Sequence, residues 1–163
     1  AKCVPMIETA QAMARIDDIL EVEGIDEIYI GLNDLHIGLG LTFMFETLSG
    51  GLIDYMAEKI KAKGLPFGFG GMAKIGEGML PAERILAEHY RLGSTTVILS
   101  RTFRNEVDAE GKPILDLDAE IKKIRETEEK LKVWSEHDFA ENRKCVKIIV
   151  GNIVKTMLAG RTF

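Results

Sequence analysis

The first hundred residues alternate short apolar runs with longer segments of helical periodicity. The apolar runs predict strands over 3–8, 25–31, 65–70 and 95–99. In the segments between them, apolar residues recur every three to four positions, which predicts helices over 10–22, 48–63 and 81–92. This alternation of strand and helix indicates an α/β fold with a parallel sheet and right-handed crossovers.

The segment 32–47 follows neither period. It mixes apolar with polar residues and contains Gly38 and Gly40, so we expect a loop there. Connections between a strand and its helix usually have about 2–6 residues, and much longer loops are frequently functional.

About four βα units amount to half of an eightfold barrel. The sequence therefore predicts a partial TIM (β/α) barrel over residues 1–104. Half a barrel leaves two open sheet edges, which are a liability unless they are paired. We therefore expect the other half to lie outside this chain or to come from a second copy. The start at Ala1, almost directly before a strand, favours a segment of a longer protein.

A helical extension, 105–163, follows the barrel segment. Its helices are expected over 117–133 and 137–158, after a polar, turn-rich segment at 105–113. Ser135 and Asp138 have the spacing of a capping box that opens the last helix. That helix is too apolar to stand alone, so we expect it to pack on the barrel or on a neighbouring subunit of a homo-oligomer.

The composition narrows the class of protein. The chain has 163 residues, of which 46% are hydrophobic and 29% charged, as in a folded domain with its own core. A net charge of −5 argues against nucleic acid and anionic membrane as partners, because both require a positive face. No apolar stretch approaches the roughly 20 residues of a membrane helix. Cys3 and Cys145 lie far apart and suggest no disulfide framework, so a cytoplasmic location is expected.

Two carboxylates stand at the ends of neighbouring predicted strands. Glu8 closes the first strand, and Asp34 follows shortly after the second. Parallel strands of a barrel end at one rim, which carries the chemistry, and neighbouring strands lie about 4.8 Å apart. The two carboxylates can therefore share one hard divalent cation. The spacing alone leaves a second interpretation open, in which Asp34 only caps a helical turn.

The residues around these acids resemble a known family. The motifs that carry the likeness are Pro5-Met6-Ile7-Glu8-Thr9, Gly31-Leu32-Asn33-Asp34-Leu35 and Gly70-Gly71-Met72-Ala73. They are similar to motifs of the hydroxy-oxo-heptanedioate aldolase and citrate lyase β-subunit family. The resemblance implies that residues 1–104 are the C-terminal half of a (β/α)8 barrel. It implies Mg²⁺ or Mn²⁺ bound by Glu8 and Asp34, and a substrate carboxylate held beside Gly31 by the backbone amides of Asn33 and Asp34.

The chain also departs from that family. Members usually read Gly-Pro-Ala-Asp-Leu where this chain has Leu32 and Asn33 before Asp34. The sequence Gly-x-Asn-Asp-Leu is also similar to the phosphoenolpyruvate-utilising barrels, but the cysteine that those proteins carry after a later strand is absent beside Gly71. The family's active-site arginine and its histidine–aspartate pair belong to the first half of the barrel, so we expect the acid–base residues outside this chain.

The sequence thus predicts a divalent-metal-dependent carbon–carbon lyase or aldolase that acts on a small keto acid through a pyruvate-type enolate. Two alternatives stay open: an acyl-CoA lyase of the citrate lyase β type, and a non-catalytic half-barrel scaffold. Of the remaining candidates, His36 is interpreted as a loop residue near the site and His89 as a core residue. The glycines within 68–71 are interpreted as allowing close approach of backbone or substrate at a strand end.

Overall fold

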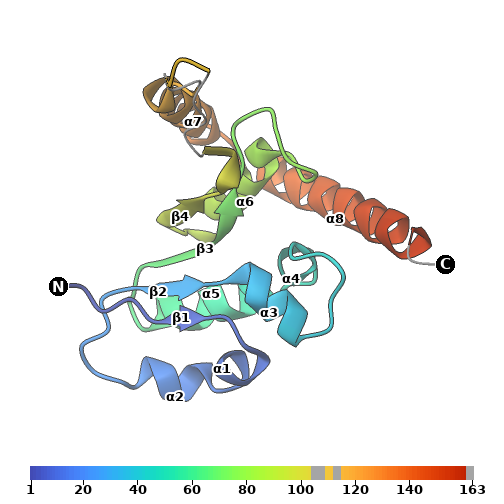
Figure 1. The fold of residues 1–163 in the computed structure, drawn as a ribbon. Helices are drawn as coiled ribbons and strands as arrows, with labels where there is room; N and C mark the ends of the chain where they lie inside the picture. The colour runs from blue at the N-terminus through green and yellow to red at the C-terminus, as the bar shows by residue number, and fades with distance from the viewer. Residues whose placement is uncertain (104–108, 112–114, 161–163) are drawn as a thin grey trace.

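The computed structural model describes residues 1–103, 109–111 and 115–160. In this part of the chain, a parallel sheet is formed by β1 (Met6–Ile7), β2 (Ile28–Ile30), β3 (Phe67–Met72) and β4 (Thr96–Leu99). The strands pair in chain order, β1-β2-β3-β4 (Figure 1). The predicted α/β class and parallel sheet are therefore confirmed.

Helices follow each strand and form the C-terminal part of the chain. They are α1 (Ala10–Ala14), α2 (Ile16–Leu20), α3 (Leu32–Gly38), α4 (Glu46–Ser49), α5 (Leu52–Ala62), α6 (Ala82–Leu92), the 3₁₀ helix η1 (Arg101–Phe103), α7 (Leu117–Leu131) and α8 (Glu136–Ala159). The Ser135–Asp138 capping box opens α8 as predicted. The turn-rich segment expected at 105–113 falls mostly outside the described residues. None of the helices that can be described is both long and apolar enough to cross a membrane.

The predicted helix over 10–22 is wrong as a single element. Arg15 leaves the helical region, with φ −105° and ψ 23°, and separates α1 from α2. Its side chain forms an ion pair with Asp18 at 3.0 Å. The break has a packing consequence, because α2 buries Ile16 and Leu20 whereas α1 buries no residue.

The predicted loop over 32–47 is also wrong, because it contains α3 and the start of α4. Asn, Asp, His and Gly favour helices weakly, which hid the helix. Leu32 and Leu35, three residues apart, are at most 1% exposed and fix α3 on the core. Before α4, the Glu46 carboxylate accepts hydrogen bonds from the amides of Thr42 and Phe43, both at 2.7 Å.

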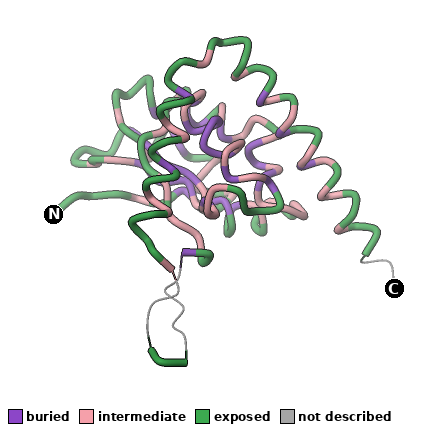
Figure 2. The backbone as a smooth tube through the Cα atoms, turned by 90° about the horizontal axis from the view of Figure 1, so that it is seen from above, coloured by how far each residue is buried: buried purple, intermediate pink, exposed green. Residues whose placement is uncertain are grey.

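The two faces of the sheet differ in burial. Ile28, Ile30 and Phe69 lie on the face that packs against α2, α5 and α6, and each has no exposed surface. Figure 2 shows the buried residues gathered in the interior of the chain, with exposed residues along its outer segments. Successive strand residues point to opposite faces. On the other face, Met6 is 48% exposed and Ile98 is 53% exposed. An uncovered face on a parallel sheet in sequential strand order is compatible with a partial barrel, and the barrel itself stays a prediction.

A buried polar network holds α8 on the α/β body, where it packs on α4 and α6. The fully buried Glu88 carboxylate of α6 lies 2.7 Å from Arg91 and 3.4 Å from Arg143 of α8, and it accepts a hydrogen bond from Asn142 at 3.0 Å. Asp54 of α5 contacts both arginines, at 2.7 Å and 2.9 Å. The network places two positive groups against two negative groups, so the negative charge of the buried Glu88 carboxylate is balanced by the arginines. The C-terminal end of α8 extends away from the sheet (Figure 1).

Candidate functional site

The carboxyl ends of β1 and β2 bring the predicted site residues to one hollow of about 180 Å³. Glu8 follows β1 directly, and Asp34 lies in the first turn of α3, after β2. Gly31 and Asn33 line the same hollow. Its other walls come from Met6, Tyr29, Leu32, Met44, Gly70, Gly71 and Ile98. The structure therefore places all four predicted residues together, as expected from the common rim of parallel strands.

Gly31 contributes to this hollow through its missing side chain. A Cβ atom at this position would lie 3.0 Å from Glu8 Cβ and 3.1 Å from Glu8 Oε2. The Gly31 amide donates to the Ile7 carbonyl at 2.9 Å, so it already has an acceptor within the sheet. The backbone of Gly31 is extended, with φ −82° and ψ 93°. A Cβ atom at this position would therefore displace the Glu8 side chain by a few tenths of an ångström.

Asn33 and Asp34 are both exposed in the first turn of α3. The Asn33 side-chain amide donates to Asp34 Oδ1 at 3.4 Å, which orients the carboxylate weakly. The first turn closes through the Leu35 amide and the Gly31 carbonyl, at 3.1 Å. The backbone amides of the first turn of a helix have no intrahelical acceptor, and the described residues provide none for Asn33 or Asp34.

Tyr29 is a site residue that the sequence interpretation missed. Its hydroxyl donates to the Gly70 carbonyl and accepts from the Ile98 amide at 2.8 Å. The side chain thus links β2 to β3 and β4, where the β3–β4 register shifts between Gly68 and Gly71. Burial raises the pKa of Tyr29 to about 12, so the phenol stays protonated and can make both hydrogen bonds.

The feature of the sequence that indicates this role of Tyr29 is the run of glycines in β3. Gly68 is the register partner of Tyr29, and a Cβ there would lie 2.7 Å from the Tyr29 ring and 2.4 Å from the Thr96 carbonyl. The interpretation of these glycines as permitting close approach is therefore confirmed for Gly68. A large aromatic residue facing a glycine on a neighbouring strand was the pattern to look for.

The two histidines singled out in the sequence have different outcomes. His36 belongs to α3 and not to a loop, and its Nδ1 lies 3.2 Å from the Leu32 carbonyl. It is not among the residues that line the hollow. His89 is a core residue as predicted, with 4% exposure and its ring stacked on Phe69 at a centroid distance of 3.8 Å.

Within the described ranges, no group of three or more His, Cys, Asp or Glu residues is placed to hold a metal ion. Glu8 and Asp34 are the acidic residues that line the hollow. Water or substrate would therefore have to complete the coordination of an ion bound there. Both side chains offer the oxygen atoms that Mg²⁺ and Mn²⁺ prefer. The donor set fits an open-sided site for a hard cation.

The fold and the hollow define an α/β protein with two carboxylates at the carboxyl edge of a parallel sheet. No protein-family profile matches the chain. It is 38% identical over 77 residues to a hydroxypyruvate/pyruvate aldolase of Rhizorhabdus wittichii, in an alignment that covers 43% of this chain and 31% of the relative. The aligned part of the chain therefore spans about a third of that relative. The similarity agrees with an aldolase superfamily and does not single out the hydroxy-oxo-heptanedioate aldolase and citrate lyase family.

Proposed function

We propose that this chain is part of a divalent-metal-dependent carbon–carbon lyase or aldolase that acts on a small keto acid through a pyruvate-type enolate. The observation that carries the proposal is the convergence of Glu8 and Asp34 on one hollow beside Gly31. The partial similarity to a hydroxypyruvate/pyruvate aldolase supports the class of reaction.

The proposed ligands of the ion are Glu8 and Asp34, with Mg²⁺ or Mn²⁺ as the cation. When bound, such an ion would act as a Lewis acid that stabilises the negative charge developing on the enolate oxygen of the substrate. Gly31 leaves the space in which the Glu8 carboxylate lies, and the Asn33 side chain orients Asp34. The chain thus supplies two oxygen donors from neighbouring strand ends.

The substrate carboxylate is proposed to lie against the backbone amides of Asn33 and Asp34. Both residues line the hollow, and the described residues provide no acceptor for their backbone amides. Tyr29 remains a neutral phenol that keeps Gly70 and Ile98 at a fixed distance, so the opposite wall of the hollow is held by two hydrogen bonds.

We further propose that the sheet is an arc of a barrel whose other part supplies the acid–base residues. The sequential strand order and the sheet face on which Met6 and Ile98 are exposed support this arrangement. A doubly wound sheet would reverse its strand order and place helices on both faces.

Isothermal titration of Mn²⁺, with and without pyruvate, tests the proposed site. We expect pyruvate to tighten Mn²⁺ binding, and Glu8→Gln and Asp34→Asn each to abolish that coupling while circular dichroism stays unchanged. Glu58→Gln, on the exposed side of α5, is the matched control and should bind as the wild type does. If both site variants still bind Mn²⁺ as the wild type does, Glu8 and Asp34 are not the metal ligands. If the wild type binds no ion, the non-catalytic scaffold is favoured.

A further inference from the structure

A cavity of about 540 Å³ lies where α6, α7 and α8 meet. The described residues that line it are all different from those that line the hollow at Glu8. Most of its surface is apolar, and the apolar side chains in its walls are those of Ile75, Pro81, Leu131 and Trp134. Ligand pockets typically have volumes of about 300–1,000 Å³ and mostly apolar walls with a few polar groups. The cavity therefore has the size and lining of a small-molecule site.

Arg84 of α6 brings a positive charge to this cavity. Its Nη1 donates to Asn142 Oδ1 at 3.0 Å, and Asn142 Nδ2 donates to the Arg84 carbonyl at 3.2 Å. A guanidinium has five N–H donors, and the described residues provide no carboxylate for this one. In that part of the chain, His89 Nε2 is the one side-chain nitrogen that is buried without a partner. The unpaired nitrogens of Arg84 therefore keep accessible surface, where a ligand can reach them.

Lys130 of α7 and Trp134, which follows that helix, add further hydrogen-bond donors. Neither the Lys130 ammonium nor the Trp134 indole N–H has an acceptor among the described residues. The carboxylate in the lining is that of Glu83, whose Oε1 accepts from the Gly76 amide at 2.8 Å. Two positive groups against one negative group leave the walls with an excess of positive charge. An anion would balance this charge and accept from the unpaired donors.

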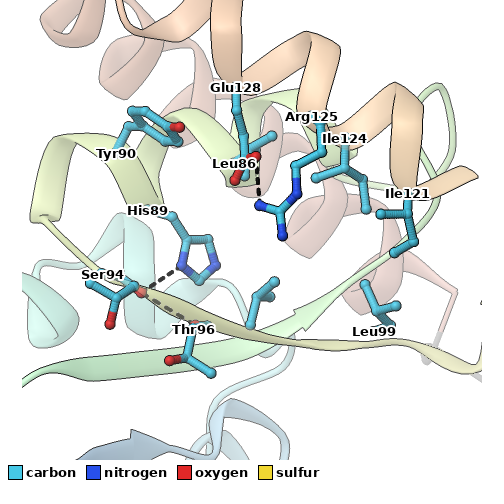
Figure 3. Close-up of a pocket in the computed structure, with 12 residues that line it drawn as sticks. Leu86, His89, Tyr90, Ser94, Thr96, Leu99, Ile121, Ile124, Arg125 and Glu128 are labelled. Atoms are coloured by element: carbon cyan, nitrogen blue, oxygen red, sulfur yellow. Dashed lines mark hydrogen bonds and ion pairs between the residues drawn. The ribbon is translucent and has the colours of Figure 1, made fainter.

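The neighbouring cavity between α6, β4 and α7 has no such excess of charge. Arg125 in its wall forms an ion pair with Glu128 at 2.7 Å (Figure 3). His89 in the same wall is neutral, because burial lowers its pKa. The chain as a whole carries a net charge of −5, so the positive lining at Arg84 is a local feature and does not reflect the general composition.

We propose that the cavity between α6, α7 and α8 binds an organic monoanion, a carboxylate with an aromatic ring as its apolar body. The carboxylate accepts from the unpaired donors of Arg84, with Lys130 as the second positive group. Guanidinium groups bind carboxylates through charge-assisted hydrogen bonds, which are about twice as strong as neutral ones. The ring packs against Trp134, since aromatic pairs are favourable in offset or edge-to-face arrangements. The small excess of positive charge favours a monoanion over a polyphosphate.

Fluorescence of Trp134 reports on this cavity directly, because it is the only tryptophan of the chain. The probes are 3-phenylpropionate and 3-phenylpropanamide, which share ring and length but differ in charge, and they are titrated without added metal. We expect 3-phenylpropionate to change the emission saturably and to bind at least tenfold more tightly than the amide. Acetate, which has the charge without the ring, should bind at least tenfold more weakly than 3-phenylpropionate.

Two variants test the positive groups separately. Arg84→Gln should weaken the binding of 3-phenylpropionate about tenfold and Lys130→Gln about threefold, and neither should change the binding of the amide. Lys132→Gln, at the end of α7 but outside the lining, is the matched control and should bind both probes as the wild type does. Lys130 is exposed, so its variant decides the matter if Arg84→Gln fails to fold.

Equal affinity of the wild type for the carboxylate and the amide would overturn the proposal, as would the lack of a saturable change with 3-phenylpropionate. Unchanged affinity for 3-phenylpropionate in Lys130→Gln and in folded Arg84→Gln would overturn it as well. An emission of Trp134 that shifts with protein concentration and not with the probe would show that a second copy of the chain covers the cavity, and the proposal would fail.

Discussion

Protonation of His89 should govern part of the acid sensitivity of this fold. The ordinary pKa of histidine is about 6.5, and burial lowers that of His89 to about 3. Below pH 6.5 the unfolded chain therefore takes up a proton at this position that the folded chain does not. The contribution of His89 to folding stability is fully present above about pH 6.5 and is lost progressively as the pH falls toward 3.

The size of this effect follows from the difference between the two pKa values. Each unit of pH between them costs about 1.4 kcal/mol for one group, so the loss between pH 7 and pH 5 is about 2 kcal/mol. This is a large share of the roughly 5–15 kcal/mol by which folded domains are stable. The burial of His89 at 4% exposure justifies using the full value without a discount for solvent.

Urea unfolding of the wild type and of His89→Phe at pH 8, 7 and 5 measures the effect. Phenylalanine retains a ring that can stack on Phe69 but cannot titrate. The free energy of unfolding of the wild type should fall by about 2 kcal/mol more than that of the variant between pH 7 and 5. The gap between the two proteins should be nearly constant from pH 8 to 7, which serves as the internal control. Equal losses in both proteins would show that the His89 ring takes up its proton in the folded state, and the reasoning from burial would fail.

Two further substitutions test how side chains are positioned. Gly31→Ala should weaken Mn²⁺ binding about tenfold or more in calorimetry without unfolding the chain, because the added Cβ would lie 3.0 Å from Glu8 Cβ. An unchanged affinity for Mn²⁺ would mean that Gly31 does not set the position of the Glu8 carboxylate. Glu88→Gln should lower the free energy of unfolding in urea by about 1.5–3 kcal/mol, because the partly buried Arg91 and Arg143 lose one charged acceptor and keep only Asp54. The matched control is Glu141→Gln, which removes an exposed ion pair with Lys144 and should change the free energy of unfolding little. Equal losses of stability in the two variants would refute the role of the buried network.

The sequence pattern located the regular elements well wherever local preference and packing agreed. The stripe Ile85, Leu86, His89 and Leu92 is buried along α6 as its period predicted, and Gly93 closes that helix at φ +77°. The pattern failed at α3, where polar residues of weak helical preference are held by two buried leucines. It also failed at Arg15, where the chain breaks a continuous helical period to bury Ile16. In both places tertiary packing outweighed local preference.

For the candidate site, the sequence by itself determined that Glu8 and Asp34 follow neighbouring parallel strands, because the strand period and the order of elements are local properties. Only the tertiary structure decided that Glu8 lies over Gly31 and that Tyr29 bridges two other strands through Gly70 and Ile98. The buried network at Glu88 likewise joins helices far apart in the chain. Such contacts depend on which side chains meet across the sheet and between layers. Hydrophobic periodicity specifies which face of an element is buried, and it does not specify which residue that face will meet.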